Sequence, residues 1–428
     1  MAGCHSERHH INPHQNNHSV NTNLIQDKIL KCRDEKLSVF AEVEEGEDDD
    51  TSVYTGSAGR AWTMLKVAKQ QENAALAERA KNVLVRARRN KKSRQRRGGR
   101  VSFIGGICGP PVLLARACHE GSDLNLPSIS DSSLVIECCR EVAVDHLDAA
   151  LSEDTPDEVL FGRAGYLLGL ITLLRENSIP VESIKVLEHA ARTVCQKMIE
   201  SGKSYSKLRR HNEWPGNEVN PTMWWQWHDK EYLGAAHGVS GILYSLLLAE
   251  NFLPDGSMIK DILPTLQTLL SYQFPSGNFP SSLGRSEKND RLVHWCHGSP
   301  GLIHLLLEAH TRFKSLNDQL SSECLEAAER CAFVVWTRGL LKKGYSMCHG
   351  VSGNAYALLR MWQVTGEQKH LEQAMIFANW CCNSEKIPAE YPPDRPRSLF
   401  EGEAGPVYMM TDFSANRQQL RIAKFPGF

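Results

Sequence analysis

A short glycine motif that recurs along the chain constrains the fold more than any other feature of the sequence. The pattern Gly-x-x-Gly, followed by an apolar run, occurs seven times, with successive spacings of 50, 56, 76, 60, 52 and 52 residues. Each spacing is long enough for two helices and their loops, so the pattern indicates a chain of helical hairpins. The first glycines of the seven copies are Gly56, Gly106, Gly162, Gly238, Gly298, Gly350 and Gly402.

The local hydrophobic pattern also favours helices. Apolar residues recur at intervals of three and four in segments 159–175, 241–250, 302–309 and 355–361, and strand-like alternation is scarce. One hairpin cannot bury its apolar face alone, so neighbouring hairpins must stack. We therefore predict an all-α protein, a double-layered α/α toroid (barrel) of seven hairpins. The Gly-x-x-Gly junctions would gather at one end of this toroid, around its axis.

The two glycines of each motif have different expected roles. The first can adopt a positive φ, and the second lets another backbone approach closely. The residue before the second glycine is always small, as in Ala58, Ser240 and Ser352. A tight junction from loop to helix is the structure that these residues predict.

Two segments stand apart from the repeats. Residues 1–51 are polar, carry five of the seventeen histidines and end in an acidic run, so we expect a flexible N-terminal segment before a toroid domain at 52–428. Residues 86–100 carry nine Lys or Arg, and we expect a disordered basic insertion there. A metal-binding role for the histidines, and a nuclear-localisation or polyanion-binding role for the basic run, remain alternatives.

Composition limits the classes of partner and compartment. Net charge is −1, so no overall field favours nucleic acid, and no nucleic-acid partner is expected. We find no run of eighteen apolar residues and no apolar leader, and the thirteen cysteines fit a reducing compartment. The expected location is cytoplasmic. A nuclear location or peripheral membrane contact stays open as an alternative.

Side chains that can bind metals or transfer protons concentrate at one position of the repeat, the two residues before each first glycine. The last four copies read Ala236-His237, Cys296-His297, Cys348-His349 and Phe400-Glu401, whereas the first three offer no group that titrates near neutral pH. If equivalent positions converge on the toroid axis, these side chains meet at one mouth.

Two thiolates and one imidazole form a common zinc site. Cys296, Cys348 and His349 are the expected ligands of one zinc per chain, and three protein ligands leave the fourth position open, as in catalytic sites. The remaining cysteines lack this repeat support.

The other side chains at this position suggest acid–base chemistry. His237 follows an alanine, so it would face the metal without binding it, as suits a general acid or base; a hydrogen-bonded core histidine is the alternative. His297 is ambiguous, and Glu401 could orient a neighbour or sit as a charge at a helix N-terminus. The tryptophans at 224, 225 and 227 either pack or form the floor of a peptide cleft.

Four long motifs resemble one known family. Segments 234–241, 294–301, 344–353 and 398–405 read GAAHGVSG, HWCHGSPG, GYSMCHGVSG and SLFEGEAG. From about residue 52 onward the chain resembles the LanC-like (lanthionine synthetase C-like) proteins, in particular their eukaryotic branch. The resemblance implies a seven-hairpin toroid with zinc ligands at Cys296, Cys348 and His349 and a catalytic histidine at His237.

The resemblance also implies an activity. Bacterial members cyclise lantibiotics by adding a Cys thiol to a dehydroamino acid, and eukaryotic members bind glutathione and add it to dehydroalanine or dehydrobutyrine in damaged proteins. Glutathione and a dehydroamino-acid-containing peptide or protein are therefore the expected partners. Lys343 and Arg8 match family contacts to glutathione, and Tyr391 stands where the family has an arginine.

Two rival functions follow from the same residues. A non-catalytic adaptor or signalling protein that binds zinc and glutathione would need the same ligands. A six-hairpin α/α toroid glycosidase would need paired carboxylates at the mouth, and only Glu401 occupies the repeat position.

Overall fold

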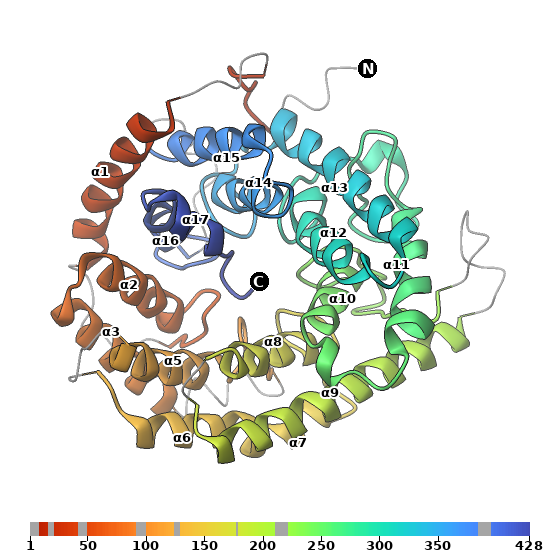
Figure 1. The fold of residues 1–428 in the computed structure, drawn as a ribbon, viewed down its shortest axis with the longest axis horizontal. Coiled ribbons are helices and arrows are strands. Elements are labelled where there is room, and N and C mark those ends of the chain that lie inside the picture. The colour runs from red at the N-terminus through yellow and green to blue at the C-terminus, as the bar shows by residue number, and fades with distance from the viewer. Residues whose placement is uncertain are drawn as a thin grey trace.

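The computed structural model describes residues 8–15, 21–41, 49–90, 100–123, 129–176, 179–209, 221–383 and 395–428. Over these ranges the chain is helical, and β-structure is limited to isolated bridges. The helices form two concentric layers around a central axis, as Figure 1 shows. The prediction of an all-α, double-layered toroid is confirmed.

Seven helices form the inner layer, and each begins within or directly after a Gly-x-x-Gly motif. Consecutive members pack against each other, and the last packs against the first, which closes the ring. These helices are buried almost all round, as expected of an element enclosed by a second layer. They are α2 (Ser57–Gln71), α5 (Gly109–Asp123), α8 (Arg163–Leu174), α10 (Val239–Leu248), α12 (Ser299–Phe313), α14 (Val351–Thr365) and α16 (Ala404–Phe413).

The outer helices are amphipathic and cover the inner ring. In α9, for example, Leu187, Ala190, Val194 and Met198 are buried at intervals of three and four, so one stripe faces inward. The outer layer comprises α3 (Ala74–Arg89), α6 (Ser132–Arg140), α7 (Leu147–Leu151), α9 (Val181–Leu208), α11 (Leu263–Leu270), α13 (Asp318–Arg338) and α15 (Gln368–Trp380). Shorter elements are η1 (Glu141–Asp145), η3 (Glu250–Phe252), η4 (Met258–Ile262), η5 (Glu287–Asn289) and α17 (Arg417–Ile422).

The N-terminal segment, expected to be flexible, contains a structural helix. Helix α1 (Thr22–Ala41) packs against α15 and α16 and is the outer partner of α16. Its Ile29 side chain is fully buried, because it faces the inner layer. The layered fold therefore begins before residue 52. Segments 1–7, 16–20 and 42–48 lie outside the described residues.

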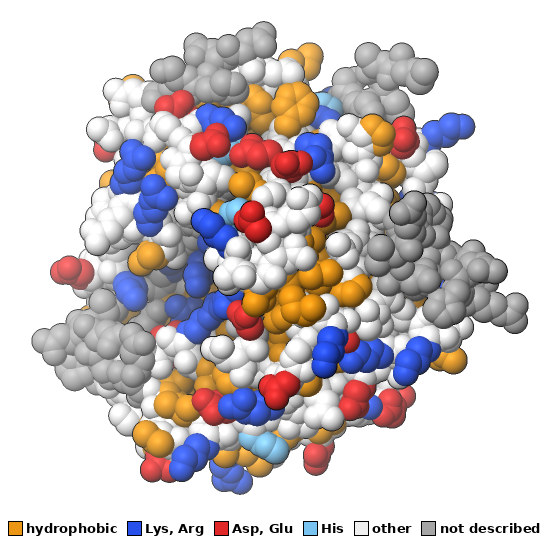
Figure 2. All heavy atoms as spheres, turned by 45° about the vertical axis from the view of Figure 1, so that its right-hand side comes forward, with side chains coloured by type: hydrophobic (Ala, Val, Ile, Leu, Met, Phe, Trp, Pro, Cys, Tyr) orange, Lys and Arg blue, Asp and Glu red, His pale blue; other side chains and the backbone are white. Residues whose placement is uncertain are grey.

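The basic run begins inside a helix. Helix α3 continues to Arg89, Ala87 is buried, and the Arg88 guanidinium bonds Glu141 at 2.6 Å and Glu137 at 3.2 Å. The start of the expected insertion is therefore part of the toroid, and residues 91–99 lie outside the described ones. Acidic and basic side chains are interspersed on the face drawn in Figure 2, in keeping with the small net charge.

The junction glycines are required by close packing rather than by φ. The prediction of a positive φ at the first glycine is wrong for six of the seven copies, since only Gly298 has one, at +104°. A Cβ on Gly162 would lie 2.0 Å from the Pro156 carbonyl oxygen, and one on Gly353 would lie 2.0 Å from that of Met347. Each loop folds back onto the start of its helix, and only glycine leaves room.

The C-terminal residues enter the bore of the toroid, and the C-terminus lies inside the ring in Figure 1. Phe425 stacks on Trp295 at 5.0 Å, and Phe428 stacks on Tyr244 at 4.5 Å between ring centroids. Beside these rings a cavity of about 460 Å³ remains, lined by inner helices and by C-terminal residues, among them Arg116, Arg175 and Phe428. None of the described helices combines the length and hydropathy that crossing a lipid bilayer requires.

Candidate active site

A belt of backbone hydrogen bonds brings equivalent junction positions together. In five of the seven pairs of neighbouring hairpins, the residues two places before the first glycines bond directly to one another, so these junction loops meet at one mouth of the toroid. The N–H groups of Cys296, Cys348, Phe400 and Tyr54 donate to the carbonyls of Cys348 (3.4 Å), Phe400 (2.9 Å), Tyr54 (3.1 Å) and Ile104 (2.8 Å) respectively. Leu160 donates in the same way to Ala236 (3.3 Å).

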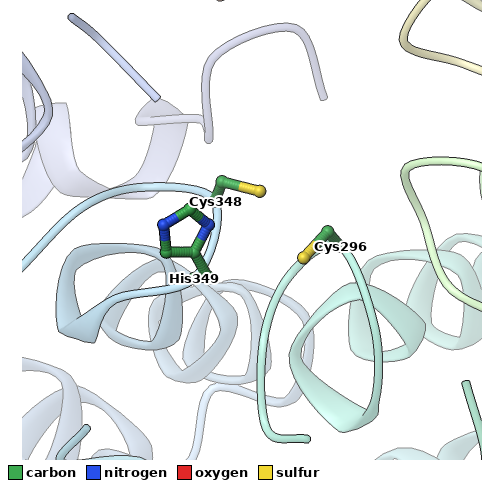
Figure 3. A group of neighbouring side chains, drawn as sticks. All are labelled: Cys296, Cys348 and His349. Atoms are coloured by element: carbon green, nitrogen blue, oxygen red, sulfur yellow. The ribbon is translucent and has the colours of Figure 1, made fainter. Parts of the chain in front are cut away.

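Three potential metal ligands lie together in this belt. One ligand atom from each of Cys296, Cys348 and His349 falls within 4.8 Å of the others. Figure 3 shows Cys296 on the loop before α12, with Cys348 and His349 on the loop before α14, their side chains facing one another. Cys348 is buried, whereas Cys296 and His349 are half-buried. A ligand could therefore reach the cluster from the mouth.

The environment of Cys348 includes a residue that the sequence analysis missed. Burial raises the pKa of the Cys348 thiol, and the neighbouring Cys296 adds to this shift while His349 opposes it. Burial, together with the nearby Cys348 and Cys296, raises the pKa of Tyr54 well above its ordinary value. Tyr54 occupies the repeat position of the first hairpin, but a tyrosine does not titrate near neutral pH.

The side chains of a second group of potential ligands are engaged in ion pairs. Glu329, Glu367 and His370 also bring ligand atoms within 4.8 Å of one another. The Lys369 ammonium lies 2.7 Å from Glu367 and 3.4 Å from Glu329, and His370 lies 3.1 Å from Glu329. This group is an ion-pair cluster between α13 and α15, and it carries no argument for a metal.

His237 lies at the mouth, outside the group of metal ligands, and is anchored by a carboxylate. Its Nδ1 is 2.7 Å from Oε2 of Glu158, a buried side chain. Glu158 in turn accepts hydrogen bonds from the N–H groups of Leu160 (3.0 Å) and Phe161 (2.6 Å). This arrangement fixes the imidazole ring and leaves Nε2 for a substrate. Glu158 precedes its glycine by four residues, so a comparison restricted to the two preceding residues could not find it.

The indole of Trp227 covers the face of His237. Their ring centroids are 4.3 Å apart and the rings are inclined by 21°. A tight turn places the indole there: Trp227 and Lys230 exchange two backbone hydrogen bonds, and His228 and Asp229 between them have φ of 47° and 54°. Such values are uncommon for residues other than glycine and often occur at functional sites. Trp224 and Trp225 are buried, in agreement with the packing interpretation.

His297 is a poor proton donor in this arrangement. Its ring centroid lies 6.3 Å from that of His237. Burial, together with His237 and His294, lowers the pKa of His297 to about 4, so its ring is neutral near pH 7. Among the described residues its Nδ1 is buried without a hydrogen-bond partner. His237 and not His297 is therefore the better-placed acid.

Arg8 and Lys343 lie along the same edge of the mouth. Residues 8–10 run antiparallel to the loop that leads to Cys348, since the Arg8 carbonyl accepts from the Lys342 N–H at 3.1 Å. Both cationic side chains are exposed. Burial lowers the pKa of His294 to about 3, and His349, Lys343 and Arg8 contribute to this shift, which places both cations near the cluster. Tyr391 lies outside the described residues.

Comparisons with known proteins identify the family of this chain. The family model described as "Lanthionine synthetase C-like protein" matches residues 47–428. "Glutathione S-transferase LANCL1" of Danio rerio is 35% identical over 382 residues, which cover 89% of this chain and 85% of the relative. "LanC-like protein GCL1" of Arabidopsis thaliana is 28% identical over 402 residues, which cover 89% and 81%. With a family model spanning all seven junctions, the chain belongs to the lanthionine synthetase C-like family.

Proposed function

We propose that this protein catalyses addition of the glutathione thiol to dehydroalanine or dehydrobutyrine residues in peptides or proteins. The observation that carries the proposal is the meeting, at one mouth, of two thiols, an imidazole and a second imidazole anchored by a carboxylate. The name of the zebrafish relative, a glutathione S-transferase, supports glutathione as the thiol.

The donor set fits zinc. Two sulfur ligands and one nitrogen ligand suit Zn²⁺ and leave one position open, and the half-buried Cys296 and His349 leave that side accessible. We infer one zinc per chain, held by Cys296, Cys348 and His349. When bound, zinc favours the deprotonated form of a thiol near neutral pH, where a free thiol is mostly protonated.

Arg8 and Lys343 are suited to hold the anionic ends of glutathione. Glutathione carries two carboxylates, and guanidinium and ammonium groups bind carboxylates through charge-assisted hydrogen bonds. Both side chains are exposed at the edge of the mouth, near His294. They would orient the tripeptide so that its thiol enters the site.

His237 supplies the proton that completes the addition. The thiolate sulfur forms a bond to the β-carbon, and the electron pair of the C=C bond moves to the α-carbon and its carbonyl. Nε2 of His237 donates a proton to the α-carbon, and the proton lost by the thiol returns to the site through solvent. Glu158 holds Nδ1 at 2.7 Å and stabilises the charged imidazolium that acts as the acid. Trp227 fixes the ring from its other side.

Mass spectrometry of a dehydrobutyrine peptide incubated with the protein and glutathione tests this function. We expect the glutathione adduct to form faster with the protein than in buffer alone. The Cys348→Ala variant should not accelerate its formation. A protein that binds zinc and glutathione but forms no adduct above background would instead be the non-catalytic adaptor.

A further inference from the structure

The cavity in the bore opens at the end of the toroid opposite the candidate active site. Its volume of about 460 Å³ is within the range of small-molecule pockets. The inner helices begin at the junctions of the mouth, whereas the cavity is lined by their last turns, for example by Gln70 of α2, Leu248 of α10 and Asp412 of α16. The 10 residues of α10 alone separate the two ends by about 15 Å.

The acidic side chains that line this cavity already have cationic partners. Among the described residues these side chains are Glu176 and Asp412. Arg116 lies 3.0 Å from Glu176, and Lys66 lies 2.7 Å from Asp412. Neither carboxylate is therefore left to neutralise a further cation of the wall.

Two further cations of the wall, Arg175 and Lys424, have no such partner. Both side chains are exposed, and neither makes an ion pair or a hydrogen bond with the part of the chain that the structure describes. Both also line a smaller adjoining cavity of about 100 Å³, so they lie close to each other where the two cavities meet. This position is suited to bind an anion.

The charges around Lys424 repel one another. Arg175 follows the C-terminus of α8, where the helix dipole favours a cation, but Lys424 comes from the C-terminal segment and is placed beside it. Desolvation lowers the pKa of the Lys424 ammonium because the walls of the bore surround it, and Arg175 and Arg360 lower this pKa further, with Glu308 opposing. A bound anion would relieve this repulsion.

The smaller cavity is lined by a buried histidine with an unpaired nitrogen. His304 is 3% exposed, and its Nε2 makes no hydrogen bond with any described residue. Burial, followed by Arg360, lowers the pKa of His304 to about 3, so the ring is neutral near pH 7. Buried polar atoms nearly always have a hydrogen-bond partner. A ligand that extends from the larger cavity into the smaller one would supply it.

The remainder of the wall is largely apolar. Trp62, Leu168, Ile171 and Phe428 line the larger cavity, and so does Ile422, which is 75% exposed. Apolar side chains beside two unpaired cations fit a ligand that has an apolar body and an anionic group.

We propose that this cavity binds a small organic phosphate, a phosphate monoester on an apolar body, through Arg175 and Lys424. A phosphate monoester carries nearly two negative charges near neutral pH, which match the two cations. A guanidinium group can donate two parallel hydrogen bonds to phosphate oxygens. This site uses neither the candidate metal ligands nor His237, and it goes beyond the proposed addition reaction.

Isothermal titration calorimetry of the full-length protein tests the proposal with three probes: naphthyl phosphate, naphthoate and inorganic phosphate. We expect naphthyl phosphate to bind about tenfold or more tightly than either of the other two. Naphthoate has the same apolar body with one charge, and inorganic phosphate has the charge without the body. Binding should weaken as salt is added, because the attraction is between charges.

Substitutions locate the binding. Arg175→Gln and Lys424→Gln should each weaken naphthyl phosphate binding by about tenfold or more, the loss expected for a hydrogen bond to a charged group. Lys185→Gln, which removes an exposed cation of α9 outside the cavity, is the matched control and should leave Kd unchanged. Without ligand, the Tm of Lys424→Gln should not be lower than that of the wild type, since the substitution removes a repelled charge.

Four results would overturn the proposal. They are an absence of naphthyl phosphate binding to the wild type, equal affinity for naphthoate, an affinity that both substitutions leave unchanged, and loss of binding in Cys348→Ala. The last would place the phosphate at the candidate metal centre. Retention of binding in Cys348→Ala, with loss of the addition reaction, would separate the two sites.

Discussion

At the residue scale, one difference separates the junction of His237 from the junctions that carry potential metal ligands. His237 follows Ala236, whereas His349 follows Cys348. The missing thiol leaves His237 outside the ligand group, and Glu158 occupies its Nδ1 instead. One position of the repeat thus holds a candidate metal ligand in one hairpin and a candidate acid in another.

We predict that His237→Ala retains zinc and glutathione but slows the addition reaction. General acid catalysis contributes ~10²–10⁴-fold, so the rate constant should fall within that range. Cys296→Ala, as the comparison, should lose the metal. Elemental analysis and turnover measured on the same samples check both statements; loss of zinc from His237→Ala would make His237 a ligand.

The carboxylate of Asp290 should give a measurable pH dependence to the loop that carries Cys296. Asp290 bonds Arg338 and Asn278, and Asn278 accepts from the first N–H of α12 at 2.8 Å. Burial raises the pKa of Asp290, but bonds from Arg338, Asn278 and Ser276 outweigh it and leave the pKa below its ordinary value. A carboxylate whose pKa is lower in the folded state than in the unfolded state stabilises the fold at pH values above its unfolded-state pKa. This stabilisation is lost as the pH falls through the folded-state pKa.

Asp290→Asn should therefore be less stable than the wild type at pH 7, and the difference should shrink as the pH falls below ~4. The free energy of unfolding in urea, compared between the two proteins at pH 7 and at pH 3, measures this difference. A difference that stays constant down to pH 3 would show that the Asp290 charge contributes nothing.

The sequence predicts part of this site for a clear physical reason. Equivalent repeat positions converge, so Cys296, Cys348 and His349 could be grouped without coordinates. Glu158 lies outside that position, and Trp227 belongs to the longest interval between glycines, where the repeat gives no guide. Tyr54 holds the right position, but its role depends on the Cys348 thiol that it meets across the closure of the ring.

At the element scale, the main departure from prediction is α1. The polar segments on both sides of it in the sequence concealed its role as an outer helix. Its partner α16 lies at the other end of the sequence, so no local pattern indicates the contact.

We predict that Ile29→Ala costs ~2–5 kcal/mol of unfolding free energy, because it removes a fully buried side chain. Leu30→Ala on the same helix should cost much less, since Leu30 is 38% exposed. Denaturant unfolding compares the two; equal losses would mean that α1 is not fixed to the toroid.

A second prediction at this scale concerns the stability lost when a junction glycine is replaced. Gly353→Ala should destabilise by ~1–3 kcal/mol or more, since its Cβ would lie 2.0 Å from the Met347 carbonyl oxygen. Gly366→Asn is the control: that glycine caps α14 with φ of 75°, a Cβ there meets nothing within 4 Å, and asparagine tolerates the conformation. Thermal unfolding should show a large loss for Gly353→Ala and a small one for Gly366→Asn. Equal losses would contradict the close-packing role.

At the scale of the whole molecule, the first and last hairpins meet at the candidate metal centre. The Phe400 N–H donates to Tyr54, and the Cys348 N–H donates to Phe400, so closure of the ring supports the loop that holds two ligands. The packed C-terminal residues reinforce this loop from inside, where Phe425 stacks on Trp295, the neighbour of Cys296. The toroid thus provides a rigid frame for ligands that come from different hairpins.

Zinc-edge X-ray absorption of the purified protein, with and without glutathione, tests the central claim most directly. The account predicts about one zinc per chain, bound by two sulfur ligands and one imidazole, with a light atom at the open position. Addition of glutathione should raise the number of sulfur ligands from two to three, and Cys348→Ala should remove the signal. A protein without zinc, or a sulfur count that glutathione leaves unchanged, would contradict the account.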